Sequence, residues 1–261
     1  MTNMYDAFSE DYDRFVSWTA RLAVEMPFIE AQLETLRSVS DHPVDVLDSA
    51  CGTGMHAIAL AQRGYYATGA DISVGMVARA RENAAVAGVK VRFETARFGE
   101  LAQQFGKESF TALLCLGNSL PHLLSDDELA AAYADFTRCL RPGGRLLIQN
   151  RNFDAVLRNR ERWIEPQSYR DGDGEWLFLR FYDFEPDGLI TFNIVTLRRR
   201  ADSSWTQQVS QTQLRPLRQD EVISGLAAVG FREINCFGNM AGDSFDPLTS
   251  GNLIVSAGIS E

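Results

Sequence analysis

The sequence lacks the features that mark secreted proteins, zinc modules and membrane spans. It has four cysteines, and none of them forms a Cys-x-x-Cys pair. This spacing argues against disulfides and metal sites and favours buried free thiols in a reducing compartment. The amino terminus has neither the basic region nor the apolar core of a signal peptide, and no stretch approaches 18 uninterrupted apolar residues. We therefore expect a cytoplasmic protein with no metal and no membrane partner.

An excess of basic residues is missing as well. The chain of 261 residues has 25 lysines and arginines against 35 aspartates and glutamates, a formal net charge of −10. Proteins that bind nucleic acids carry basic patches for the phosphate backbone, so no nucleic-acid partner is predicted. The run Arg198-Arg199-Arg200 stands beside Asp202 and is interpreted as a solvated turn. The expected partner is a small molecule, and a homo-oligomer is left open.

Strand and helix patterns alternate between residues 44 and 150. Apolar runs typical of buried strands lie at 44–50, 66–73, 89–96, 110–117 and 145–150. Helical patterns separate them at 55–64, 74–88 and 125–144, the last with a predicted capping box of Ser125 and Glu128. Parallel strands need helical crossovers, so the alternation predicts a doubly wound, mostly parallel α/β sheet with helices on both faces.

The flanking segments have different patterns. Residues 10–37 repeat apolar side chains at three- and four-residue steps, which predicts a helix that Pro27 interrupts or divides. After residue 160, runs of β-branched and aromatic residues with a turn signal at Pro186-Asp187-Gly188 predict antiparallel strands. We expect amino-terminal helices at 1–40, an α/β core at 41–160, an antiparallel β insertion at 161–216, and the rest of the core sheet at 217–261.

The loop from Asp48 to Gly54, "DSACGTG", follows the first buried strand and contains Gly-x-Gly without a third glycine. A dinucleotide-binding loop uses three glycines around the pyrophosphate, and this loop does not match it. Asp71 ends the next strand, 17 residues beyond Gly54 (71 − 54). An acid there can accept hydrogen bonds from both ribose hydroxyls, so the pattern favours an adenosine-containing ligand. The alternative role for Asp71 is a helix cap, although Ser73 can cap instead.

Together with "RCLRPGGRLLI" at 138–148, this loop resembles the class I S-adenosylmethionine-dependent methyltransferases. The segments "CLGNSLPHL" (115–123), "QNRNFD" (149–154) and "YDAFSEDYDRF" (5–15) are similar to the glycine and glycine/sarcosine N-methyltransferases within that family. The resemblance implies a Rossmann-like core, an amino-terminal helical lid, and S-adenosyl-L-methionine as the cofactor.

The resemblance also assigns residues to the cofactor. Gly52, Gly54 and the Ala50 carbonyl would meet its methionine end, Asp71 its ribose, and Arg21 its carboxylate. The full set comprises Tyr12, Trp18, Arg21, Ala50, Gly52, Gly54, Asp71, Ile72, Met76, Arg97, Phe98, Leu116, Gly117 and His122. Arg97 stands where many family members have an aspartate, so a backbone contact is expected from it. Core packing for Ile72 and Met76, a solvated Arg21 and a structural His122 are the alternatives.

Three further residues, Tyr5, Asn118 and Arg151, are expected at the methyl acceptor. By resemblance, the Arg151 guanidinium would hold a substrate carboxylate, which points to N-methylation of a glycine-like amino acid. The alternative for Arg151 is an ion pair with Asp154 or another local acid. If Arg151 meets Asp154 rather than facing the pocket, an O- or S-methyltransferase acting on another metabolite becomes the better hypothesis. An oxidoreductase that binds a nucleotide and a cofactor-binding regulator without turnover are the alternatives from other classes.

Overall fold

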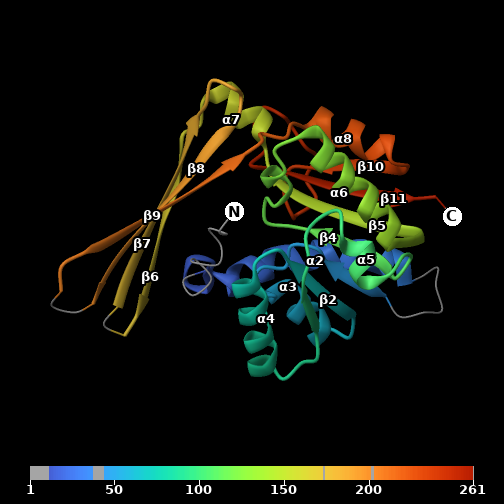
Figure 1. Ribbon diagram of the computed structural model, residues 1–261, viewed down its shortest axis with the longest axis horizontal. Helices are drawn as coiled ribbons and strands as arrows, with labels where there is room; N and C mark the ends of the chain where they lie inside the picture. The colour runs from blue at the N-terminus through green and yellow to red at the C-terminus, as the bar shows by residue number, and fades with distance from the viewer. Residues whose placement is uncertain (1–11, 38–43, 173, 201–202, 261) are drawn as a thin grey trace.

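The computed structural model describes residues 12–37, 44–172, 174–200 and 203–260. Its central sheet has the strand order β10-β11-β5-β4-β1-β2-β3 (Figure 1). The strands are β1 (Asp45–Asp48), β2 (Tyr66–Asp71), β3 (Arg92–Thr95), β4 (Phe110–Cys115), β5 (Leu140–Arg151), β10 (Phe231–Phe237) and β11 (Asn252–Ile259). Strands β1 to β5 pair in parallel, and β11 runs antiparallel to β5 and β10. The predicted doubly wound, mostly parallel sheet is confirmed.

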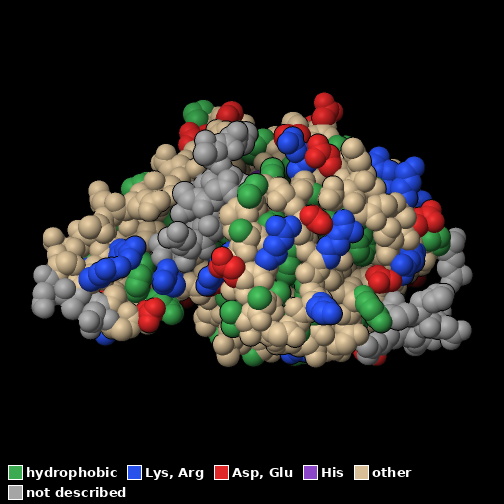
Figure 2. All heavy atoms as spheres, turned by 60° about the horizontal axis from the view of Figure 1, so that its bottom comes forward, with side chains coloured by type: hydrophobic (Ala, Val, Ile, Leu, Met, Phe, Trp, Pro, Cys, Tyr) green, Lys and Arg blue, Asp and Glu red, His purple; other side chains and the backbone are tan. Residues whose placement is uncertain are grey.

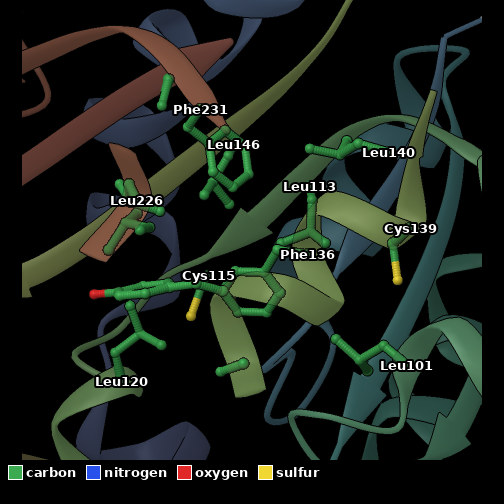
Figure 3. Close-up of a cluster of buried hydrophobic side chains, with 14 of the residues drawn as sticks. Leu101, Leu113, Cys115, Leu120, Phe136, Cys139, Leu140, Leu146, Leu226 and Phe231 are labelled. Atoms are coloured by element: carbon green, nitrogen blue, oxygen red, sulfur yellow. The ribbon is translucent and has the colours of Figure 1, made fainter. Parts of the chain in front are cut away.

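Helices cover both faces of this sheet. Helices α2 (Trp18–Arg37), α3 (Met55–Gln62) and α4 (Val74–Ala87) pack on one face, and α5 (Leu101–Phe105), α6 (Asp126–Cys139) and α8 (Gln219–Ala228) on the other. Figure 3 shows the second layer, where Phe136 of α6 and Leu226 of α8 lie against Leu113 and Leu146 of the sheet. The apolar runs of the sequence thus become strands that are buried from both sides.

Several local predictions are confirmed. Ser125 and Glu128 form the capping box of α6, and the Ser73 hydroxyl accepts from the Met76 N–H at the start of α4. Gly88 ends α4 in a left-handed conformation. Cys51, Cys115, Cys139 and Cys236 are free, and only Cys236 is not fully buried.

The prediction that Pro27 breaks the first helix is wrong. Helix α2 continues through Pro27 to Arg37, and the helical conformation is interrupted earlier, at residues 16–17, between one helical turn at 12–15 and Trp18. An interior proline costs a helix about 3 kcal/mol. Met26 and Ile29 beside it are at most 1% exposed, and their burial offsets that cost. The interpretation of the arginine run at 198–200 as a turn is also wrong, because it is the exposed end of a strand.

A second, antiparallel sheet stands beside the core (Figure 1). It consists of β6 (Trp163–Asp171), β7 (Gly174–Phe184), β8 (Ile190–Arg200) and β9 (Thr206–Leu214), and α7 (Phe153–Asn159) joins it to β5. The predicted turn at Pro186–Gly188 connects β7 to β8. One cluster of this sheet packs with Tyr12 and Phe15 from the turn before α2. The amino-terminal turn therefore lies between the two sheets.

Acidic and basic side chains are interspersed on the face shown in Figure 2. None of the helices among the described residues is long and apolar enough to cross a membrane.

Candidate active site

The loop after β1 is tied to the end of β2. The Cys51 N–H donates to the Ala70 carbonyl (2.8 Å), and the Gly52 N–H donates to Asp71 Oδ2 (2.8 Å). The other carboxylate oxygen, Oδ1, accepts from the Ser73 N–H (2.9 Å). The loop, which includes the half-buried Ala50, and the predicted ribose-binding acid thus form one unit at the carboxyl ends of parallel strands. Open α/β sheets bind their ligands at this edge.

The loop needs its second glycine for packing. Gly54 has a φ of 82° and immediately precedes α3. A Cβ at this position would lie 2.7 Å from Phe93 Cζ and 2.8 Å from Ala80 Cβ. Both distances are shorter than carbon atoms tolerate, so the loop can approach β3 and α4 only because residue 54 has no side chain.

Asp48 is a buried carboxylate that was not assigned a role from the sequence. It ends β1, is 2% exposed, and neither of its oxygens has a hydrogen-bond partner among the described residues. Burial raises the pKa of Asp48 to about 6, and the negative charge of Asp71 adds to this effect. A buried carboxylate is unfavourable unless a cation or a donor satisfies it. Its position beside the glycine loop suits the ammonium group of a bound ligand.

A cluster of four polar side chains connects α2 with α3 and β5. Glu25 accepts from Arg21 Nε (3.0 Å) and Gln149 Nε2 (2.9 Å) and pairs with His56 Nε2 (2.6 Å). Arg21 also donates to Gln149 Oε1 (3.1 Å). Burial alone would raise the pKa of Glu25, but the His56 hydrogen bond and the Arg21 charge outweigh it and hold the pKa at about 2. Arg21 is therefore fixed at the site and is not a solvated surface residue.

Asp13 attaches the turn before α2 to the glycine loop. Its Oδ1 accepts from Thr53 Oγ1 (2.6 Å) and Trp18 Nε1 (2.9 Å). Its Oδ2 accepts from Arg79 Nε (3.0 Å) and Asn83 Nδ2 (3.2 Å) of α4. Burial opposes ionisation here, yet these hydrogen bonds together lower the pKa of Asp13. The predicted lid segment is thus anchored to two elements of the core.

Tyr12 lies over the loop in the same turn. The nearest atom to a Cβ built on Gly52 is Tyr12 Cε1, at 3.8 Å. Its ring centroid is 6.0 Å from that of Phe15 and 6.2 Å from that of Trp18. Phe15 in turn meets Phe178 of β7 edge to face (5.4 Å). The turn therefore extends from the glycine loop to the second sheet, whereas Tyr5 lies outside the described residues.

The predicted adenine-side residues differ in exposure. Ile72 is 59% exposed and open to a ligand, whereas Met76 is 1% exposed and packs in the core. The Arg97 side chain is 65% exposed and forms an ion pair at the surface. Phe98 packs edge to face against Phe136 (5.5 Å). Arg97 can therefore offer its backbone to a ligand, while Phe98 packs against the core.

The ends of β4 and β5 are joined by the residues that follow β4. Leu116 is buried, and the Gly117 N–H donates to Gln149 Oε1 (3.1 Å). Asn118 has a φ of 66°, a left-handed conformation that asparagine tolerates better than most residues. Its Oδ1 accepts from the Arg151 N–H (2.9 Å), which leaves the Nδ2 protons as its donors to a ligand. His122 ends the short helix η1 (Leu120–His122), and burial lowers its pKa to about 4, so its imidazole is neutral at pH 7.

A cavity of about 330 Å³ lies between these strand ends and the inner face of the second sheet. Its lining includes Tyr12, Arg21, Glu25, Gly117, Asn118, His122, Gln149, Asn150 and Arg151 on one side and Ile164, Arg180, Tyr182, Phe192 and Ile194 on the other. A shallower hollow around Arg81 and Lys90, over α4 and β3, contacts none of the predicted site residues. The cavity therefore brings together some of the residues predicted for the cofactor (Tyr12, Arg21, Gly117 and His122) with Asn118 and Arg151, which are predicted for the acceptor.

Arg151 lines this cavity but has a different acidic partner from the one considered in the sequence. Its Nη2 lies 3.2 Å from Glu161 Oε2, and both side chains are more than one third exposed. Asp154, in the first turn of α7, instead accepts from the Gln219 N–H at the start of α8 (2.9 Å). The alternative of an ion pair with a local acid is therefore met by Glu161 and not by Asp154, whose carboxylate accepts from the backbone of α8. Arg151 still lines the cavity.

Comparison with known proteins agrees with this geometry. Residues 46–144 match a family model described as a methyltransferase domain. The chain is 30% identical over 235 residues to a glycine/sarcosine N-methyltransferase of Aphanothece halophytica, which covers 90% of this chain and 82% of that protein. The chain belongs to the glycine/sarcosine N-methyltransferase family. It is an S-adenosylmethionine-dependent methyltransferase.

Solved structures show the same fold. A S-adenosylmethionine-dependent methyltransferase from Clostridium acetobutylicum superposes with a TM-score of 0.78 at 16% identity, over 99% of this chain and 100% of that one. An amino pentose methyltransferase from Micromonospora echinaspora, solved with S-adenosylmethionine bound, gives a TM-score of 0.73 at 19% identity over 97% of each chain.

The polar groups at the strand ends of this methyltransferase fit its cofactor. Asp48 offers an unpartnered buried carboxylate to an ammonium, and Asp71 stands at the end of β2 for ribose hydroxyls. Arg21 can share its guanidinium between Glu25 and a ligand carboxylate. Among the described residues, no group of three or more histidine, cysteine or acidic side chains could hold a metal ion.

Sequence reasoning missed several residues of the site. The patterns around Asp48, Glu25 and Gln149 predict only a strand or a helix, although an acid directly before a glycine loop is a usable signal for Asp48. Asp13 lay within a quoted motif but received no role. Arg180 had a weak signal, a single cation at an alternating position in an aromatic strand.

Proposed function

We propose that the enzyme transfers a methyl group to the nitrogen of glycine, sarcosine or a similar amine that carries a carboxylate. The observation that supports this most is the position of Arg151 and Asn118 in a cavity that also contains the cofactor-side residue Arg21. The name of the Aphanothece relative, which aligns over most of the chain, supports the same acceptor class.

Each part of the site has a distinct task in this reaction. When bound, the cofactor would supply a methyl group on a positively charged sulfur; the lone pair of a neutral amine would take this methyl as the carbon–sulfur bond breaks, which leaves S-adenosylhomocysteine and a methylated ammonium. Arg151 and the Asn118 amide bind and orient the acceptor, which converts a bimolecular encounter into an aligned one. Tyr12, Phe15 and the inner face of the second sheet exclude water from the cavity. The neutral His122 contributes hydrogen bonds without a further charge.

The test is an assay of S-adenosylhomocysteine release with purified full-length protein over amino acids, amines, phenols and thiols. We expect the highest kcat/KM with glycine or sarcosine and methylated nitrogen in the product by mass spectrometry. Turnover confined to phenols or thiols would contradict the N-methylation proposal and favour the O- or S-methyltransferase hypothesis. Cofactor binding without turnover of any acceptor would favour a regulatory role.

A further inference from the structure

One arginine of the cavity has no role in the reaction described so far. Alternate residues of a strand face the same side, and the inner row of β7 contains Trp176, Phe178, Arg180 and Tyr182. The three aromatic residues of this row are at most 5% exposed. A guanidinium in such a row is unfavourable unless its charge is satisfied. Arg180 lines the cavity from the sheet that faces the core strand ends.

Contacts within the described residues leave the charge of Arg180 without a counterion. Its guanidinium lies over the Phe15 ring, 4.8 Å from the centroid, and its Nη2 donates to the Glu165 carbonyl at 3.4 Å. Its buried Nε has no hydrogen-bond partner, and no described carboxylate forms an ion pair with it. Burial lowers the pKa of Arg180, and the positive charge of Arg151 acts in the same direction.

The other two arginines of the cavity are already paired. Arg21 pairs with Glu25 (3.0 Å) and Arg151 pairs with Glu161 (3.2 Å). The charges of these pairs cancel, so the cavity wall retains one positive charge, that of Arg180. One acceptor carboxylate would neutralise it.

We propose that Arg180 binds the carboxylate of the methyl acceptor from the second sheet, and that this residue selects amino acids over uncharged amines. The inference rests on the proposed function and deepens it. A guanidinium provides a planar fork of donors that matches a carboxylate, and Phe15 holds this fork from one side. Arg151, partly neutralised by Glu161, then orients the acceptor at the core wall.

The test compares glycine with glycinamide, which has the same size but no carboxylate, using the full-length enzyme at saturating S-adenosylmethionine. For Arg180→Met we expect the KM for glycine to rise roughly a hundredfold, because truncating one partner of a desolvated ion pair is costly. The kcat/KM for glycinamide and the cofactor affinity should change less than about threefold. Arg180→Lys keeps the charge without the fork, and we expect roughly a tenfold rise in KM for glycine.

Arg162→Met is the matched control. Arg162 belongs to the same sheet region but pairs with Asp183 (2.7 Å) and lies over Phe181 on the other face, so this variant should keep wild-type kinetics. Equal losses with glycine and glycinamide, or an unchanged KM for glycine in Arg180→Met, would overturn the inference while leaving the proposed function intact. A wild-type enzyme that methylates no carboxylate-bearing amine would overturn both. Should Arg180→Met fail to fold by thermal denaturation, the glycine-to-glycinamide ratio of Arg180→Lys decides.

Discussion

The two sides of the site carry opposite charges. On the core side, Asp48 and Asp71 end β1 and β2 without being part of the cavity lining, and Glu25 lines the cavity beside its partner Arg21. On the side of the second sheet, Arg180 is the charged group among aromatic residues, and Arg151 at the end of β5 pairs with Glu161 just before β6. A sulfonium cofactor with an ammonium group suits the core side, the acidic wall, and an acceptor with a carboxylate suits the other side, the cationic wall. Under the proposed function, these charges would direct the cofactor and the acceptor to opposite sides of the site.

The walls also differ in how they are built. The acidic wall is a network in which loop, strand and helix are joined by short hydrogen bonds, as around Glu25 and Asp71. The other wall consists of side chains from alternate positions of long strands, and its arginine has few contacts. Replacements on the acidic wall should therefore affect cofactor binding, and replacements on the cationic wall should affect the acceptor. The predictions below test this division, from the largest expected effect to the smallest.

Asp71→Ala should weaken S-adenosylmethionine binding by roughly a hundredfold or more while leaving the acceptor KM nearly unchanged. The carboxylate would bind two ribose hydroxyls and also holds the Gly52 N–H, and each hydrogen bond to a charged group contributes about 1.5–3 kcal/mol. Isothermal titration calorimetry measures the affinity. Glu94→Ala, which removes an acid of the neighbouring strand β3 that pairs with Arg92, is the control and should bind normally. A normal affinity in Asp71→Ala would show that the ribose assignment is wrong.

Arg151→Lys should raise the acceptor KM roughly thirtyfold and leave cofactor affinity within about twofold, because lysine lacks the planar fork. Initial rates with glycine at saturating cofactor give the KM, and calorimetry gives the affinity. Glu161→Gln is the variant to compare with it. This change removes the ion-pair partner of Arg151 but keeps Arg151 itself, so the acceptor KM should not rise. An equal loss of cofactor affinity in Arg151→Lys would show that Arg151 acts on the cofactor, and the proposed division of roles between the two walls would be wrong.

The same division explains how far the sequence predicts this molecule. The core was predictable because each strand is a short apolar run, and because the glycine loop, Asp71 and the cap at Ser73 are local patterns. Arg151 could be placed in the cavity because it directly follows a buried strand. These predictions need only the order of residues along the chain.

Other features depend on contacts between distant segments. Pro27 stays inside α2 because neighbours on both sides are buried against the core, which local propensity does not reveal. The cluster of Glu25, His56 and Gln149 joins three separate elements, so no spacing of residues along the sequence predicts it. Arg180 reaches the site only because the second sheet turns one face towards the core. Its role requires the register of β7 and the position of that sheet.

Asp48→Asn should weaken cofactor binding roughly tenfold at pH 7.5 and remove its dependence on pH. The pKa of Asp48 lies at about 6, so its carboxylate is ionised above that pH and protonated below it. A cofactor ammonium prefers the ionised form, and the wild-type affinity should therefore fall as the pH decreases below about 6. Calorimetric titrations at pH 7.5, 6.0 and 5.0 measure this trend. A wild-type affinity that is constant over this range would contradict a contact between Asp48 and the ammonium.

The stability of the cofactor-free enzyme should follow the opposite trend. The folded-state pKa of Asp48 is raised above its ordinary value of 3.8, so the unfolded chain ionises more easily. The contribution of Asp48 to the free energy of unfolding therefore decreases as the pH rises from about 4 to 6. Asp48→Asn should be about 3 kcal/mol more stable than the wild type at pH 7 in urea denaturation, since the pKa is raised from 3.8 to about 6 and each pKa unit corresponds to about 1.4 kcal/mol. The residue would then weaken the fold but strengthen cofactor binding.

Asp13→Asn should have the smallest effect, and it should affect the cofactor and the acceptor alike. The turn that Asp13 anchors places Tyr12 over the glycine loop and Phe15 against Arg180, so it borders both ligands. The variant keeps an oxygen for Thr53 but weakens the ion pair with Arg79, and such partly exposed pairs contribute about 1 kcal/mol or less. We expect cofactor Kd and acceptor KM to rise together by about threefold. Glu82→Gln removes the other, exposed partner of Arg79 and should change neither value. A rise in Kd alone would mean that the turn serves only the acidic wall, whereas a matched rise in both would identify it as the element that closes the cavity over cofactor and acceptor at once.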